Sequence, residues 1–148
     1  MNNALIKNIV SSNAGLAALA LRIPIGIIFI AHGAQKLFGA FGGYGLEGTG
    51  QWMASIGLEP GYLMALMAGS AEFFGGIALL IGLLVRPAAA ALAIAMLVAI
   101  FAVHFANGLF MSNNGYEFGL ALLAASVSLL FSGAGKLSVD ALIENKLS

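Results

Sequence analysis

Long apolar stretches alternate with short glycine-rich or polar segments along the chain. A helix needs about 20 predominantly apolar residues to cross the roughly 30 Å hydrocarbon core of a membrane. Four windows approach this length, and the last is the shortest. They cover residues 16–38, 62–84, 87–109 and 116–131. This pattern predicts an all-α membrane protein with four transmembrane helices.

The connections between these windows predict how the helices are arranged. The first, residues 39–60, contains glycines that interrupt a helix, while its segment QWMASI favours a short ordered helix or turn at the membrane interface. The second is very short: Arg86 can cap a helix end and Pro87 suits the first turn of the next helix. The third, residues 106–115, is short and polar. Short connections favour antiparallel neighbours, so we predict one up-down bundle formed by residues 1–148.

The basic residues predict the orientation of this bundle, because lysine and arginine are enriched on the cytoplasmic side of membranes. Only Lys36 falls at the end opposite the two termini. The residues at the other end are Lys7, Arg22, Arg86, Lys136 and Lys146. Both termini are therefore expected in the cytoplasm, with Arg22 as an anchor that extends to that interface. The N-terminal segment lacks the pattern of a cleavable signal and is expected to be a retained interfacial lead-in.

Composition supports the membrane assignment and excludes several functions. Hydrophobic residues make up 61% of the chain and charged residues 8%, against about a quarter charged in soluble domains. Membrane lipid is thus an expected partner. The basic residues form no positive stripe, so nucleic acid is not an expected partner. The absence of cysteine excludes disulfides, thiolate metal sites and thiol redox chemistry of the chain's own, so a redox role would need a cofactor or a partner.

Glu72 is the strongest functional candidate in the sequence. It lies near the middle of the second window, too deep for its side chain to reach an interface. An ionisable group at such a depth costs roughly 3 kcal/mol on insertion and usually has a partner. We therefore expect the carboxyl to be either protonated or paired with a cation such as His32 or Arg22.

Further polar side chains gather in the predicted outer half of the bundle. They are His32, Gln35 and Lys36 in the first window, His104 in the third and Glu117 at the start of the fourth. His32 and Lys36 are four residues apart and share a helix face. By helical rise, the ionisable members of this set fall within a layer about 6 Å deep. If their faces converge, they line a polar pocket that opens outward, with Glu72 as its floor.

Each of these residues also has a simpler interpretation. Lys36 could extend to the lipid headgroups, Glu117 could be a solvated carboxylate at a helix N-terminus, and the two histidines could be neutral and hydrogen-bonded to backbone. Four aromatic residues near them could sandwich a planar ring or simply pack. These are Phe73, Phe74, Phe105 and Phe118.

The third window carries a stripe of small residues that permits close helix approach. The stripe consists of Ala91, Ala95, Ala99, Ala102 and Ala106. At about 100° per residue, it is predicted to lie almost opposite His104. It is therefore a candidate interface for a homo-oligomer.

The polar set fits a quinone site better than a metal site. The paired Glu-x-x-His motifs of di-iron bundles and the HExxH motif are absent, so no metal is expected. Haem ligation by His32 and His104 rests on similar depth alone, so no haem is expected. A quinone requires an apolar aromatic slot, donors to its carbonyls and a group that carries protons. Glu72 and His32 are the candidate catalytic residues. The candidate ligand-binding residues are Lys36, His104, Glu117, Gln35, Tyr116 and Phe73.

Three segments together resemble the DoxX family of small bacterial four-helix membrane proteins. They are LRIPIGIIFIAHGAQKLFGAFGGYGLEG, AEFFGGIALLIGLLVRPAA and NGYEFGLALLAASVSLLFSGAGKLSVD. The resemblance covers about residues 16–140. The matching positions are His32, Lys36, Gly39, Glu72, Gly75, Arg86, Pro87, Tyr116, Glu117, Gly133, Gly135, Ser138 and Asp140. It implies a multi-pass protein of the inner (plasma) membrane. The family includes a membrane subunit of an archaeal thiosulfate:quinone oxidoreductase, proteins linked to quinone or catechol resistance, and a partner of oxidative-stress enzymes.

The leading hypothesis is a redox-associated inner-membrane protein that binds a quinone-like or phenolic molecule in the outer half of the bundle. One alternative is a small proton-coupled exporter or carrier, which would use the same carboxylate for transport. Another is a non-catalytic membrane adaptor for a soluble oxidoreductase. The sequence has no self-contained catalytic motif, so it leaves open whether the chain is a subunit of a quinone-linked enzyme.

Overall fold

Helices make up the regular structure of residues 3–147, the part of the chain that the computed structural model describes, and no strand occurs there. The first two residues of the predicted lead-in lie outside this part. The α-helices are α1 (Asn3–Val10), α2 (Ala17–Phe38), α3 (Gly45–Ser55), α4 (Gly61–Ile81), α5 (Val85–Ala99), α6 (Glu117–Ser132) and α7 (Val139–Leu147). A π-helical turn, η2 (Ile100–His104), continues α5. Short 3₁₀ segments are η1 (Ala40–Gly42), η3 (Phe105–Asn107) and η4 (Met111–Asn113).

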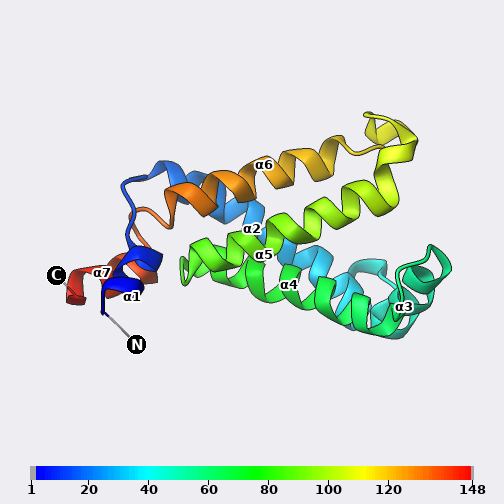
Figure 1. Ribbon diagram of the computed structural model, residues 1–148, viewed down its shortest axis with the longest axis horizontal. Coiled ribbons are helices and arrows are strands. Elements are labelled where there is room, and N and C mark those ends of the chain that lie inside the picture. Colours follow the sequence, from blue (N-terminus) through cyan, green and yellow to red (C-terminus); the bar gives the residue numbers. More distant parts are fainter. Residues whose placement is uncertain (1–2, 148) are drawn as a thin grey trace.

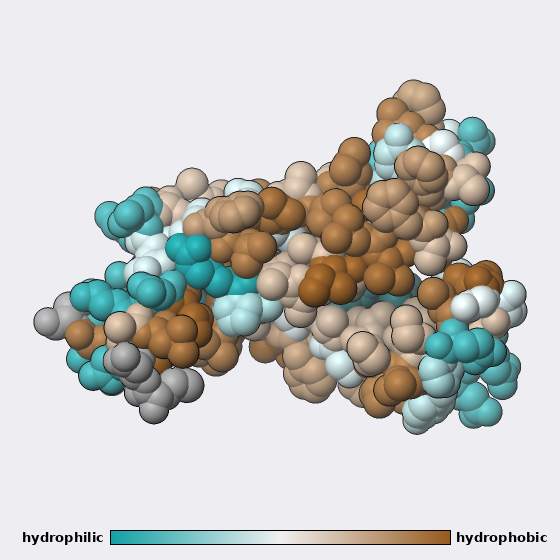
Figure 2. Space-filling model, viewed as in Figure 1, coloured by the Kyte–Doolittle hydropathy of each residue, from teal (hydrophilic) through white to brown (hydrophobic). Residues whose placement is uncertain are grey.

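Three of the predicted windows are confirmed as helices long and apolar enough to cross a membrane. They are α2, α4 and the continuous helix Val85–Asn107 that α5, η2 and η3 form. The fourth, α6, is apolar but has only 16 residues. Large hydrophobic side chains cover much of the outer surface of these helices (Figure 2). A surface of this kind needs lipid around it.

The four long helices lie side by side, and consecutive ones run in opposite directions (Figure 1). Both described ends of the chain lie at one end of the bundle, whereas α3 lies at the other (Figure 1). Helix α2 packs mainly on α4, and α5 packs on both α4 and α6. Glycine allows the close approach of α2 and α4, because a Cβ at Gly26 would lie 2.8 Å from the carbonyl oxygen of Gly76. The same two helices meet again where Gly33 faces the backbone of Phe73.

The predicted helix in the first connection is present as α3. It packs against α4 and, less extensively, against α2. Met53 of α3 is buried, whereas Trp52 is 38% exposed. Helix α3 thus covers the ends of α2 and α4 that lie away from the chain termini.

The chain ends form two short helices, α1 and α7, that the apolar pattern did not predict. They pack against each other. Next to them, Arg22 is fully buried, and its guanidinium donates hydrogen bonds to the carbonyl oxygens of Leu79 (3.2 Å), Lys136 (3.3 Å) and Leu137 (3.0 Å). The predicted extension of Arg22 to the interface is therefore wrong. The side chain instead donates to carbonyls at the end of α4 and in the segment before α7.

Asp140 of α7 fixes the start of α5. Its carboxylate accepts hydrogen bonds from the backbone N–H groups of Leu84 (2.7 Å) and Val85 (3.0 Å). Burial raises the pKa of Asp140, and these two hydrogen bonds and the charges of Arg22 and Arg86 oppose that rise. The carboxylate acts as a side-chain cap for the helix N-terminus.

Arg86 caps a helix end, as predicted, but the helix is α6. Its guanidinium donates to the carbonyl oxygens of Leu130 (2.8 Å) and Phe131 (2.6 Å) in the last turn of α6, and to that of Ser11 (3.1 Å). The two arginines and Asp140 therefore connect α2, α4, α5, α6 and α7 at one end of the bundle. This leaves the opposite half of the bundle to carry the remaining intramembrane polar groups.

Candidate functional site

An ion pair between α2 and α4 lies at the centre of the polar set. Lys36 Nζ is 2.6 Å from Glu72 Oε2. The Glu72 side chain is 5% exposed and that of Lys36 is 24% exposed. The sequence predicted a cation such as His32 or Arg22 as the partner of Glu72. A cation is the partner, but it is Lys36. Arg22 lies at the far end of the bundle, whereas the close packing of α2 on α4 brings the long Lys36 side chain to the carboxylate.

Two cavities meet at this ion pair. The larger has a volume of about 390 Å³ and the smaller about 260 Å³. Both are lined by Lys36, Glu72, Ala99 and His104. The pair is thus the common wall of two spaces with different surroundings.

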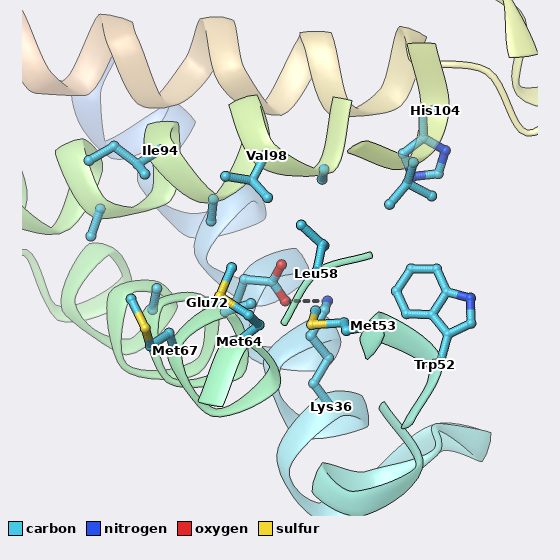
Figure 3. Close-up of a pocket in the computed structure, with 16 residues that line it drawn as sticks. Lys36, Trp52, Met53, Leu58, Met64, Met67, Glu72, Ile94, Val98 and His104 are labelled. Carbon is cyan, nitrogen blue, oxygen red and sulfur yellow. Dashed lines mark hydrogen bonds and ion pairs between the residues drawn. The ribbon is translucent and has the colours of Figure 1, made fainter. Parts of the chain in front are cut away.

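The larger cavity, here called the α4–α5 groove, is mainly apolar. Its lining comes from α4, α5 and the covering helix α3 (Figure 3). The apolar lining includes Trp52, Met53, Met64, Met67, Ile94 and Val98. In Figure 3, the tip of Lys36 meets the carboxylate of Glu72, and Val98 lies on the opposite wall of the groove. Figure 2 shows a hollow with a hydrophilic floor between hydrophobic walls.

The smaller cavity, here called the α2–α6 cavity, contains more of the predicted site. It is lined by His32 and Phe29 of α2, by Phe118 and Leu122 of α6 and by the loop around Asn114. The ring centroids of His32 and Phe118 are 5.9 Å apart. With Lys36, Glu72 and His104, four of the predicted site residues line one space, although they come from α2, α4 and η2.

His104 lines both cavities because a π-helical turn changes its direction. The turn Ile100–His104 places an extra residue in the helix. As a result, Ala91, Ala95 and Ala99 line the α4–α5 groove together with His104. The prediction that the alanine stripe lies opposite His104 is therefore wrong for these residues. A homo-oligomer that uses the stripe stays a prediction.

A hydrogen bond defines the tautomer of His104. Its Nδ1 is 2.9 Å from the carbonyl oxygen of Asn114. Since a carbonyl can only accept, Nδ1 carries the proton in this contact. Nε2 is then the nitrogen that can bind a further proton or accept a hydrogen bond from a ligand.

Four predicted ligand-binding residues line neither of these two cavities. Each has a different contact. Glu117 accepts a hydrogen bond from the backbone N–H of Met111 (2.7 Å), and Gln35 donates to the carbonyl oxygen of Phe41 (3.3 Å). The remaining two are Tyr116, which stacks on Phe105, and Phe73, which packs edge-on between Phe38 and Phe74.

Several lining residues of the α4–α5 groove were not predicted. On α4 these are Met64, Met67 and Ala71. Their spacing follows the three- and four-residue repeat of one helix face. That repeat is the signal that could have identified them, whereas α3 gave no pattern that would place Trp52 in the same groove as Glu72. Within residues 3–147, no three His, Asp or Glu side chains lie close enough together to hold a metal ion.

The site can bind a small molecule that is polar at one point and apolar elsewhere. Lys36 offers ammonium N–H donors, and Glu72 offers acceptor oxygens beside them. Apolar walls exclude water, which strengthens hydrogen bonds to a ligand at the pair.

These features define a multi-pass helical protein of the inner membrane. Residues 17–105 match the DoxX family model, and the chain belongs to the DoxX family. It is 34% identical over 125 residues to a Bacillus subtilis (strain 168) protein named "Putative oxidoreductase CatD", with 84% of this chain and 85% of that protein covered. It is 35% identical over 137 residues to "Inner membrane protein YqjF" of Escherichia coli (strain K12), covering 88% and 95%. An uncharacterized Haemophilus influenzae protein is 35% identical over 127 residues, covering 81% of this chain and 85% of that protein. No solved structure matches the chain.

Proposed function

We propose that this DoxX-family protein binds a quinone-like or phenolic molecule at the Lys36–Glu72 pair and takes part in redox chemistry at the membrane. One observation carries the proposal: a partly buried ion pair forms the shared wall of two cavities inside an apolar bundle. A pair with only a structural role would not need open space on two sides. The relative named as an oxidoreductase supports the redox part of the proposal.

The two charged groups match the two redox states of such a ligand. The Lys36 ammonium would donate a hydrogen bond to a quinone carbonyl, and the Glu72 carboxylate would accept one from a phenolic hydroxyl. Reduction of a quinone to a hydroquinone consumes two electrons and two protons. His32 and Glu72 would pass the protons, and a partner oxidoreductase would supply or remove the electrons.

We further propose that α2, α4, the helix Val85–Asn107 and α6 all cross the membrane, with both termini in the cytoplasm. Helix α6 is about 24 Å long by helical rise, so its flanking residues would complete the crossing. The basic residues at the end that holds both termini favour this orientation.

Because the chain contains no cysteine, the orientation can be tested by single cysteines at two exposed positions. We expect Ser112→Cys to react with an impermeant maleimide in spheroplasts, and Asn145→Cys to react only after lysis. The reverse pattern would contradict the orientation.

Binding can be tested by spectral titration of the purified protein with a short-chain benzoquinone. Glu72→Gln keeps the shape of the side chain and removes its charge. We expect it to weaken binding about tenfold or more, equivalent to the loss of about 1.4 kcal/mol. Glu47→Gln, at an exposed carboxylate on α3, is the matched control and should bind like the wild type. Equal affinity of the wild type and Glu72→Gln would remove Glu72 from the site.

A further inference from the structure

We propose that the ligand carries a long apolar tail, that this tail lies in the α4–α5 groove, and that the ligand enters from the bilayer rather than from water. This inference rests on the proposed function for the polar head, which would lie at the Lys36–Glu72 pair. It assigns a membrane-soluble class of ligand and a separate subsite for its tail.

The lining of the α4–α5 groove has the chemistry of a tail site. Most of it comes from methionine, alanine and branched aliphatic side chains, including Met64, Met67, Ile94 and Val98. Methionine adapts its shape to irregular apolar ligands. The volume of about 390 Å³ lies in the range of sites that enclose an organic ligand. A small phenol alone would need only the polar part of this space.

The groove also opens where a lipid-soluble molecule could enter. Met67 and Ile94 line it and remain 58% and 63% exposed. Both lie on helices long enough to span the membrane. The rim of the groove therefore faces hydrocarbon, and the surface around the hollow is hydrophobic (Figure 2). An apolar tail can move into the groove from the bilayer without crossing water.

The charges at the polar end favour a neutral head over a phospholipid head. Lys36 and Glu72 together carry no net charge, and Glu72 is buried near the middle of α4. A phosphate would require an excess of positive charge at the site and would have to leave the interface. A carbonyl or hydroxyl needs only one donor and one acceptor, which the pair supplies. A quinone-like ring with an alkyl or isoprenoid tail meets both conditions.

Trp52 provides a direct probe of the groove, because it lines the groove and is the only tryptophan of the chain. The full-length protein in nanodiscs is titrated with two benzoquinones, one bare and one with an alkyl tail of about ten carbons, and quenching of Trp52 fluorescence is followed. Ala95→Phe fills part of the groove and leaves both residues of the ion pair in the sequence. Ala124→Phe, at an exposed position on α6 outside both cavities, is the matched control.

We expect Ala95→Phe to weaken binding of the tailed quinone about tenfold or more and to change the affinity for the bare ring by less than about threefold. Unchanged binding of the bare ring also shows that this variant is folded. Ala91→Leu, a smaller obstruction, should give an intermediate loss for the tailed quinone. Ala124→Phe should leave both affinities unchanged.

Three results would overturn the proposal. The first is equal binding of the tailed quinone by the wild type and Ala95→Phe. The second is an equal loss for both quinones, which would place the ring rather than the tail in the groove. The third concerns phospholipids with brominated acyl chains. If these lipids quench Trp52, if Ala95→Phe removes the quenching, and if the tailed quinone does not reduce it, the occupant of the groove is a lipid chain. A different result would show that the proposed function itself is wrong. In that case Glu72→Gln would not weaken the binding of either quinone.

Discussion

Removal of one partner of the Lys36–Glu72 pair should destabilise the protein more than removal of both. Lys36→Met keeps an unbranched apolar side chain and removes the charge, while Glu72→Gln keeps the shape and removes the charge. The double variant leaves no unpaired ion. Comparison of the four proteins isolates the interaction between the two side chains.

The magnitude follows from the separation and burial of the two groups. At 2.6 Å and an effective dielectric constant of about 20, the attraction is about 6 kcal/mol, but removing each ion from water costs several kcal/mol. The net contribution of the pair is therefore small, whereas an ion left alone in a fully buried site costs about 3–5 kcal/mol. Lys36 is 24% exposed, which reduces the effect. We expect a loss of about 2–3 kcal/mol for Lys36→Met and about 1–2 kcal/mol for Glu72→Gln, since a freed ammonium can extend towards water.

The assay is reversible unfolding by sodium dodecyl sulfate in mixed micelles. The free energies of unfolding should give a coupling of about 2–3 kcal/mol or more between the two positions, because the double variant should lose less than either single variant. Additive effects within about 0.5 kcal/mol would refute the reasoning.

Three further predictions concern the helix contacts and the mode of action. Gly33→Ala should cost about 2 kcal/mol or more in the same unfolding assay, because its Cβ would overlap the backbone of Phe73, whereas Ala20→Val on the exposed face of α2 should change stability by less than about 0.5 kcal/mol. Asp140→Ala should cost about 1–2 kcal/mol through the lost cap of α5, and Asp140→Asn should cost less because it keeps an acceptor; equal losses would contradict the capping role. Proteoliposomes should bind quinone without pH-dependent movement of solute, and such movement would favour the carrier alternative.

The spans could be predicted from the sequence because the membrane imposes their length and composition. The predicted windows begin and end within three residues of the corresponding helices. The importance of Glu72 could be predicted for the same reason, since a carboxyl group at that depth needs a partner. These conclusions require only the position of a residue along one helix.

The partner of Glu72 could not be predicted, because it depends on how two helices are rotated against each other. Lys36 was assigned to the wall of the same pocket, but its alternative role at the headgroups fitted the sequence equally well. Gly26 and Gly33 allow α2 to pack closely on α4, and this packing brings Lys36 to Glu72. The role of glycine in such a contact is visible only when the opposite helix is known.

The predicted direction of the His104 side chain was wrong because the prediction assumed a regular α-helix throughout. A π-helical turn has no strong sequence signal, yet it moves every following side chain to a different face. The helices at the chain ends were missed for another reason. Because α1 and α7 are short and partly polar, a search for apolar windows of membrane length does not find them. The burial of Arg22 follows from their presence.

The central claim is that the Lys36–Glu72 pair binds a redox-active ring compound, and analysis of small molecules that remain bound to the purified protein tests it most directly. Mass spectrometry of extracts from the wild type should detect a quinone or phenol in near-stoichiometric amount. The Lys36→Met/Glu72→Gln double variant, purified in the same way, should lose it. Equal retention by both proteins, or retention of phospholipid alone, would contradict the account.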